Sequence, residues 1–122
     1  MRLREEELAV VLSAYGFTLG LLNLEPYSPV PKRKLVEIAD TMRVVLRLGR
    51  TNYSELVDRL VEENILVEQN GFVQFNFKKI EDDPELVELF NRAGNIATRL
   101  ADKLKIRLAR MMSGEYGQYV AN

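Results

Sequence analysis

The order of apolar and polar positions predicts a chain made mostly of helices, with one pair of strands. Four stretches place apolar residues three and four positions apart, which is the spacing that gives a helix one buried face. A fifth stretch, residues 65–77, alternates instead and contains Asn70-Gly71, which predicts a β-hairpin. We therefore expect a mainly α protein with one β-hairpin, an α+β fold. The predicted helices span residues 4–24, 32–48, 52–64 and 83–112.

The Asn-Gly pair is a strong hairpin signal, because both central residues of a type I′ turn need φ > 0. A two-residue loop also sets the register, so that Gln69 faces Phe72 across the strands and Leu66 faces Phe75. A hairpin by itself is marginally stable, so it must pack on the helix before it and on another part of the chain. In this register one face carries four apolar side chains, which are Leu66, Val73, Phe75 and Phe77.

The first predicted helix is apolar around so much of its circumference that we expect it to be buried on more than one side. Gly16 and Gly20 lie four positions apart, which indicates either a close approach of another helix or a kink. The uncharged run from Leu8 to Leu24 follows three glutamates, where a signal peptide needs positive charge, so we expect no membrane span and no secretion. Residues 24–32 contain three prolines and predict a loop.

The last predicted helix is capped by Asp82 or Asp83 and carries an apolar stripe about 42 Å long at 1.5 Å per residue. One small domain does not cover such a stripe, so we expect a homodimer through the same helix of a second copy. Alternatively, Gly94-Asn95 breaks the helix into two. Gly114 is expected to end it and to leave residues 113–122 as a flexible tail. The predicted dimer interface consists of Leu86, Phe90, Ala93, Ala97, Leu100, Leu104 and Leu108.

The chain has no cysteine and no histidine, which excludes thiol and imidazole nucleophiles and the usual zinc ligand sets. No catalytic set or phosphate loop can be placed among the other residues, so we expect neither an enzyme nor a bound cofactor or metal. The net charge is −1, but positive and negative residues are separated along the chain, because residues 31–50 carry +4 and residues 51–70 carry −4. A basic segment of this kind is the electrostatic footprint of nucleic-acid binding.

The run from Leu56 to Val73, LVDRLVEENILVEQNGFV, leads from a helix into a short hairpin, after an earlier helix and a tight turn. This arrangement over residues 32–77 resembles the winged helix-turn-helix superfamily, and within it the small MarR- and PadR-like regulators. The resemblance implies a winged helix-turn-helix with a long C-terminal helix of the kind that those regulators use to dimerise. It also implies a cytoplasmic, homodimeric protein that binds double-stranded DNA and regulates transcription.

In that interpretation the third helix approaches a DNA groove and basic residues of the second helix contact phosphates. The third helix, residues 52–64, is however acidic, because four carboxylates outnumber Arg59. This favours an alternative, a winged-helix protein–protein interaction module or assembly subunit that docks through that helix and does not bind DNA. The predicted DNA-contacting residues are Lys32, Arg33, Lys34, Arg43, Arg47, Arg50, Thr51, Asn52, Tyr53, Ser54 and Arg59.

Overall fold

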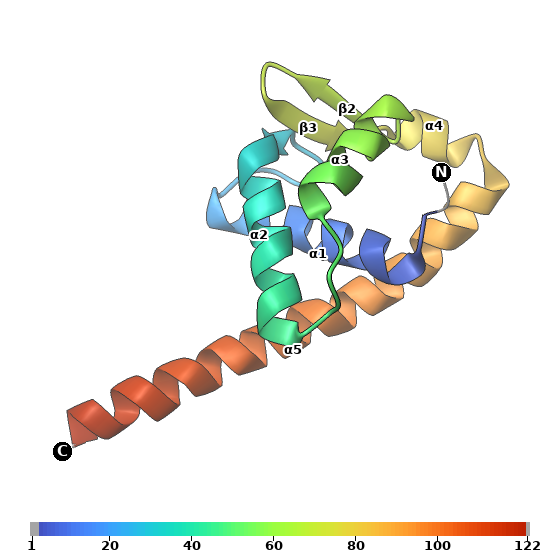
Figure 1. Ribbon diagram of the computed structural model, residues 1–122. Coiled ribbons are helices and arrows are strands. Elements are labelled where there is room, and N and C mark those ends of the chain that lie inside the picture. Colours follow the sequence, from blue (N-terminus) through green and yellow to red (C-terminus); the bar gives the residue numbers. More distant parts are fainter. Residues whose placement is uncertain (1–2, 122) are drawn as a thin grey trace.

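Two long helices, α1 (Glu5–Leu21) and α5 (Pro84–Ala121), lie against each other, and α2 packs on both of them (Figure 1). The computed structural model describes residues 3–121, with side chains described as far as Met112. The protein is mainly helical with a small three-stranded antiparallel sheet, so the predicted α+β class is confirmed. The remaining elements are β1 (Val30–Pro31), α2 (Lys32–Leu46), α3 (Tyr53–Glu62), β2 (Leu66–Gln69), β3 (Phe72–Phe75) and α4 (Phe77–Glu81).

The first helix is buried on several sides, as predicted, because the four consecutive residues from Leu8 to Val11 have no exposed surface. Both α5 and α2 cover it. The prediction of a close helix contact at Gly16 and Gly20 is wrong, since nothing lies within 4 Å of where a Cβ would stand at either position. The buried hydroxyl of Thr18 donates to the carbonyl of Ala14 at 2.7 Å, which satisfies it inside the helix.

The hairpin has the predicted register. Gln69 lies opposite Phe72 and Leu66 lies opposite Phe75, as expected, with two further pairs between them. The turn Asn70-Gly71 has φ values of 53° and 80°, as a type I′ turn requires. Local turn chemistry therefore determines how these two strands pair.

The sheet has a third strand that the sequence did not predict. β1 lies in the proline-rich segment that was expected to be a loop, and it pairs with β3 in the order β1-β3-β2. Pro31 is tolerated because β1 is an edge strand, where a missing N–H costs no ladder hydrogen bond. Burial drives the pairing, since Val30 is fully buried and the next amide, of Lys32, donates to the carbonyl of Gly71 at 2.9 Å.

The second strand of the hairpin ends at Phe75, so Phe77 does not continue it as predicted. Phe77 instead begins the short helix α4. The side chain of Asn76 accepts the N–H of Lys79 at 3.2 Å and so caps this helix. The face shared by Leu66, Val73 and Phe75 is buried without Phe77, which is 37% exposed.

Between α2 and α3 the chain makes a short loop. α2 ends at Leu46, two residues before its predicted end, where Arg47 adopts a left-handed conformation with φ 55°. Gly49, also left-handed with φ 87°, lies inside the loop and does not end the helix. The side-chain oxygen of Asn52 starts α3 by accepting the N–H of Glu55 at 3.1 Å.

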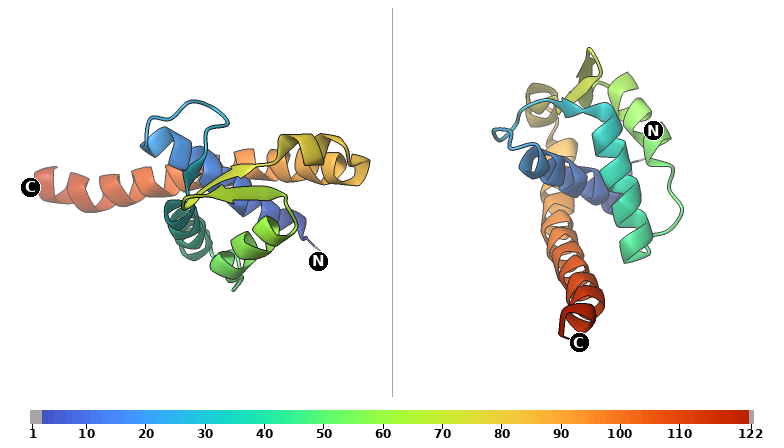
Figure 2. Two further views of the ribbon diagram at one scale, coloured as in Figure 1. Left: turned by 90° about the horizontal axis from the view of Figure 1, so that it is seen from above. Right: turned by 90° about the vertical axis from the view of Figure 1, so that its left-hand side faces the viewer.

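The last helix is continuous over 38 residues, about 57 Å at 1.5 Å per residue. The alternative of a break at Gly94-Asn95 is therefore wrong. The predicted end at Gly114, with a flexible tail over residues 113–122, is wrong as far as Ala121, because the backbone is helical to that residue; Asn122 lies outside the described residues. A glycine costs a helix about 1 kcal/mol relative to Ala, and no proline follows Gly94 or Gly114. This cost alone does not end α5 at either glycine. The far part of α5 extends away from the other elements (Figures 1 and 2).

Candidate functional site

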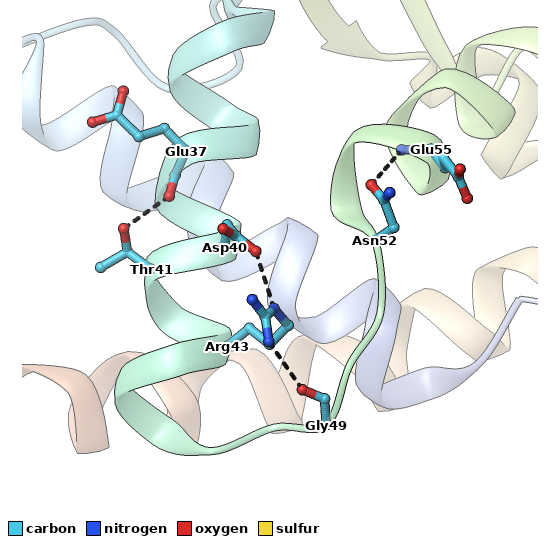
Figure 3. A network of polar contacts seen from close by, with 7 residues as sticks. All are labelled: Glu37, Asp40, Thr41, Arg43, Gly49, Asn52 and Glu55. Carbon is cyan, nitrogen blue, oxygen red and sulfur yellow. Dashed lines mark hydrogen bonds and ion pairs between the residues drawn. The ribbon is translucent and has the colours of Figure 1, made fainter.

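Many of the predicted DNA-contacting residues lie around a cleft of about 440 Å³ between α2 and the start of α3. α2 contributes Glu37, Asp40 and Arg43 to its lining, and the loop before α3 contributes Arg50. Figure 3 shows the polar contacts in this region. The fold therefore brings acidic and basic side chains together where the sequence predicted a basic surface.

Arg43 is tied to two groups of its own chain. Its Nε donates to Oδ1 of Asp40 at 3.0 Å, and its Nη1 donates to the carbonyl of Gly49 at 3.2 Å (Figure 3). These two hydrogen bonds join α2 to the loop that leads into α3. Arg43 thus positions the loop, and contact with a phosphate requires it to give up charge-assisted hydrogen bonds.

Lys32 lies between two carboxylates from other elements. Its Nζ is 2.6 Å from Oδ1 of Asp58 on α3 and 3.0 Å from Oε1 of Glu68 on β2. Hydrogen bonds to Asp58 and then to Glu68 raise the pKa of Lys32 above its ordinary value, so the ammonium stays charged. The two carboxylates balance its positive charge. Lys34 has an acidic partner too, because its Nζ lies 3.4 Å from Oε1 of Glu37.

Tyr53 cannot contact DNA, so its place among the predicted contacts is wrong. Its side chain is 2% exposed and belongs to the core under the start of α3. Burial, and after it the nearby carboxylates Glu7 and Glu6, raise the pKa of Tyr53 to about 12. The helical spacing of Tyr53, Leu56 and Leu60 indicated this inward position.

Four predicted cations are exposed, which are Arg33, Arg47, Arg50 and Arg59. None of them forms an ion pair with another residue in the described part of the chain. Arg33 and Arg47 stand at opposite ends of α2, about 21 Å apart at 1.5 Å per residue. The exposed cations are therefore divided among the two ends of α2, the loop before α3 and α3 itself.

The exposed face of α3 is acidic. Asn52 uses its side-chain oxygen to cap the helix, and Thr51 is half-buried. Arg59 is the cation among the exposed side chains of α3, against three carboxylates. Such a face repels phosphates and attracts cationic groups. Its exposed side chains are Ser54, Glu55, Asp58, Arg59 and Glu62.

The predicted dimer stripe of α5 is largely used inside the protomer. Four of its seven residues are at most 8% exposed, because α1 packs on them, so their assignment to a dimer interface is wrong. Leu86 and Phe90 are half-buried, and the ring of Phe90 lies edge-on to Phe75 with centroids 5.5 Å apart. Leu108 alone remains clearly exposed, at 39%. The four buried residues are Ala93, Ala97, Leu100 and Leu104.

The prediction missed an uncharged groove of about 490 Å³ on the outer face of the sheet. Val67 and Phe72, which are 47% and 45% exposed, lie on it beside the segment that precedes β1. The alternation of the hairpin already places these two side chains opposite the buried ones. Neighbouring apolar side chains exposed in this way are typical of a contact surface.

No group of three or more acidic side chains in the described part of the chain is placed to hold a metal ion. Among residues 3–121 no helix is long and apolar enough to cross a membrane. Comparison with family models, with curated proteins and with solved structures finds no match to this chain.

Proposed function

We propose that this chain is a winged-helix protein-interaction module that docks through the acidic face of α2 and α3 and does not bind DNA. The order of its elements supports a winged helix: helix, strand, helix, helix and hairpin, with β1 pairing on the hairpin. In this proposal the hairpin β2–β3 is the wing. Because a fold does not fix a function, the partner must be argued from the surface.

One observation carries the proposal, the position of Lys32 between Asp58 and Glu68. Lys32 pairs with one carboxylate of α3 and one of the wing, the two parts of a winged helix that enter DNA grooves. If Lys32 bound a DNA phosphate instead, Asp58 and Glu68 would lose their cation and would face the negatively charged DNA backbone. Duplex DNA carries one negative charge per ~1.7 Å of axis, so this arrangement opposes DNA binding.

The same face suits a cationic protein surface. Glu55 and Glu62 are exposed on α3 and stand beside Asp58, so a Lys or Arg brought by a partner would find several acceptors. Electrostatic complementarity of this kind speeds association and selects against acidic competitors. The partner of this face is therefore expected to present basic side chains.

The test is binding to mixed-sequence duplex DNA, followed by fluorescence anisotropy across a salt series. The unmodified protein should not bind even at low salt. A Glu55→Lys/Glu62→Lys variant, which turns the face basic, should gain binding that weakens steeply with salt. The matched control is Glu25→Lys/Glu81→Lys, which makes the same change in net charge at exposed positions elsewhere.

A photo-reactive amino acid in place of Ser54, used in cells of the source organism, tests the docking face directly. A cross-linked protein that is lost with Glu55→Lys/Glu62→Lys but kept with the matched control supports the proposal. Salt-sensitive DNA binding by the unmodified protein would overturn it. That result would favour a DNA-binding regulator that contacts phosphates through Arg33, Arg47 and Arg50, whose exposure is the observation in favour of this second function.

A further inference from the structure

The far part of α5 carries apolar side chains that stay largely exposed in the described part of the protomer. Leu104, at 4% exposed, is the last buried residue of α5 among those whose side chains are described. Beyond it, over residues 105–112, the helix leaves the body of the protein (Figures 1 and 2), and we name this segment the arm. The uncovered side chains of the arm are Ile106, Leu108, Met111 and Met112, which are 52%, 39%, 51% and 64% exposed.

The arm is also strongly basic. It contains Lys105, Arg107 and Arg110 and no acidic residue. Nη1 of Arg107 donates to the carbonyl of Val45 at 3.1 Å, which fastens the base of the arm to the end of α2. Lys105 and Arg110 form no ion pair with another residue in the described part of the chain. The arm therefore offers an apolar and cationic surface.

The opposite chemistry occurs at the other end of the same helix. A cleft of about 400 Å³ lies beside the start of α5, and we name it the acidic cleft. Two of its carboxylates come from the first part of α5 and a third comes from the residue that precedes the helix. Its cation, Arg92, forms ion pairs with Glu5 at 2.5 Å and with Glu88 at 2.8 Å. Its apolar lining is Leu3, Ile65, Leu86 and Leu89, and the carboxylates at this end of α5 are Asp83, Glu85 and Glu88.

The arm cannot reach the acidic cleft of its own chain. Glu85 and Arg110 stand on one continuous helix and are about 37 Å apart at 1.5 Å per residue. A second copy that lies antiparallel to the first can bring them together, because its arm then passes the start of the first α5.

From this complementarity we infer that two copies pair about a two-fold axis, with the arm of each seated in the acidic cleft of the other. A two-fold arrangement makes both contacts at once and closes the assembly at two copies. It matches Lys105 and Arg110 with Glu85 and Glu88, and it covers the apolar residues of the arm. This interface differs from the predicted stripe, which is buried inside each protomer, and it does not depend on the proposed α2–α3 docking face.

The experiment is a charge exchange, with mass in solution measured by sedimentation velocity over a range of protein concentrations. The arm variant is Lys105→Glu/Arg110→Glu, and the cleft variant is Glu85→Lys/Glu88→Lys. Each one alone opposes like charges at both contacts and should raise the dissociation constant of the dimer on the order of 100-fold. An equal mixture restores opposite charges at both contacts and should form a heterodimer. Arg33→Glu/Arg47→Glu, which changes the net charge as the arm variant does, should remain a dimer.

The mixture also guards against misfolding, because a variant that has lost its fold is not rescued by a partner. A monomeric unmodified protein at every concentration would overturn the inference, as would variants that stay dimeric or a mixture that stays monomeric. Binding of a monomeric protein to phosphatidylglycerol vesicles, abolished by the arm variant, would overturn it in favour of a lipid surface. DNA binding would instead overturn the proposed function and leave the dimer standing.

Discussion

Replacing Tyr53 with phenylalanine should make the protein more resistant to alkaline unfolding. The ring of Tyr53 is 2% exposed, and its pKa is raised to about 12 from the ordinary value of 10.0. Burial favours the neutral phenol, so this contribution to stability is complete below about pH 10 and is lost as the pH rises through about 12. Tyr53→Phe keeps the ring and removes the ionising group.

The magnitude follows from the size of the pKa difference. One pKa unit corresponds to about 1.4 kcal/mol, so a difference of about two units makes about 3 kcal/mol of unfolding free energy sensitive to alkali. At neutral pH the variant loses only the hydroxyl and its hydrogen bond with the side chain of Thr51, a cost of about 1 kcal/mol. The order of stability of the two proteins should therefore reverse between neutral pH and about pH 12.

Urea unfolding of both proteins at a series of pH values measures this reversal, and tyrosinate absorbance reports the ionisation itself. Tyr27→Phe is the matched control, because Tyr27 is 66% exposed and its removal should leave the alkaline loss unchanged. If both proteins lose stability in parallel as the pH rises, or if Tyr53 ionises near the ordinary tyrosine value of 10.0, Tyr53 is not buried and the described start of α3 is wrong.

Two further predictions concern the backbone and the core. Gly71→Ala should cost about 1–2 kcal/mol in urea unfolding, because Gly71 has φ 80° and alanine is strained there. Gly94→Ala, inside α5 with nothing near its Cβ position, should instead add about 0.5–1 kcal/mol, and equal effects at the two glycines would contradict the turn described here. Leu60→Ala should cost about 2–5 kcal/mol, because Leu60 is fully buried on α3. Leu21→Ala, at a side chain 66% exposed, should change stability by less than about 0.5 kcal/mol in the same assay, and a similar loss at both leucines would speak against the packing of α3.

Local interactions made part of this structure predictable from the sequence. The hairpin register depends on the two turn residues Asn70-Gly71, which need φ > 0 whatever surrounds them. The start of α3 depends on Asn52, whose side chain reaches an amide three residues away. The helical spacing along α1, α2, α3 and α5 likewise indicated which faces are buried. In each case the groups that interact are close together in the sequence.

Only the tertiary structure decided what each face meets. β1 forms because the proline-rich segment reaches β3, which is about forty residues further along the chain. The stripe of α5 meets α1 of its own chain, whereas the sequence predicted the same helix of a second copy. Periodicity shows that a face is apolar, but the partner that buries it depends on the packing of distant elements.

The candidate site depended on tertiary structure in the same way. The sequence determined that residues 31–50 are basic and that residues 51–70 are acidic. The fold then placed Asp58 and Glu68 on either side of Lys32, from which they are 26 and 36 residues away. A charge count adds charges along the chain, whereas the field at a surface depends on distances in space. The sequence therefore specified the charges, and the packing of α3 and β2 against the start of α2 decided that the face is acidic.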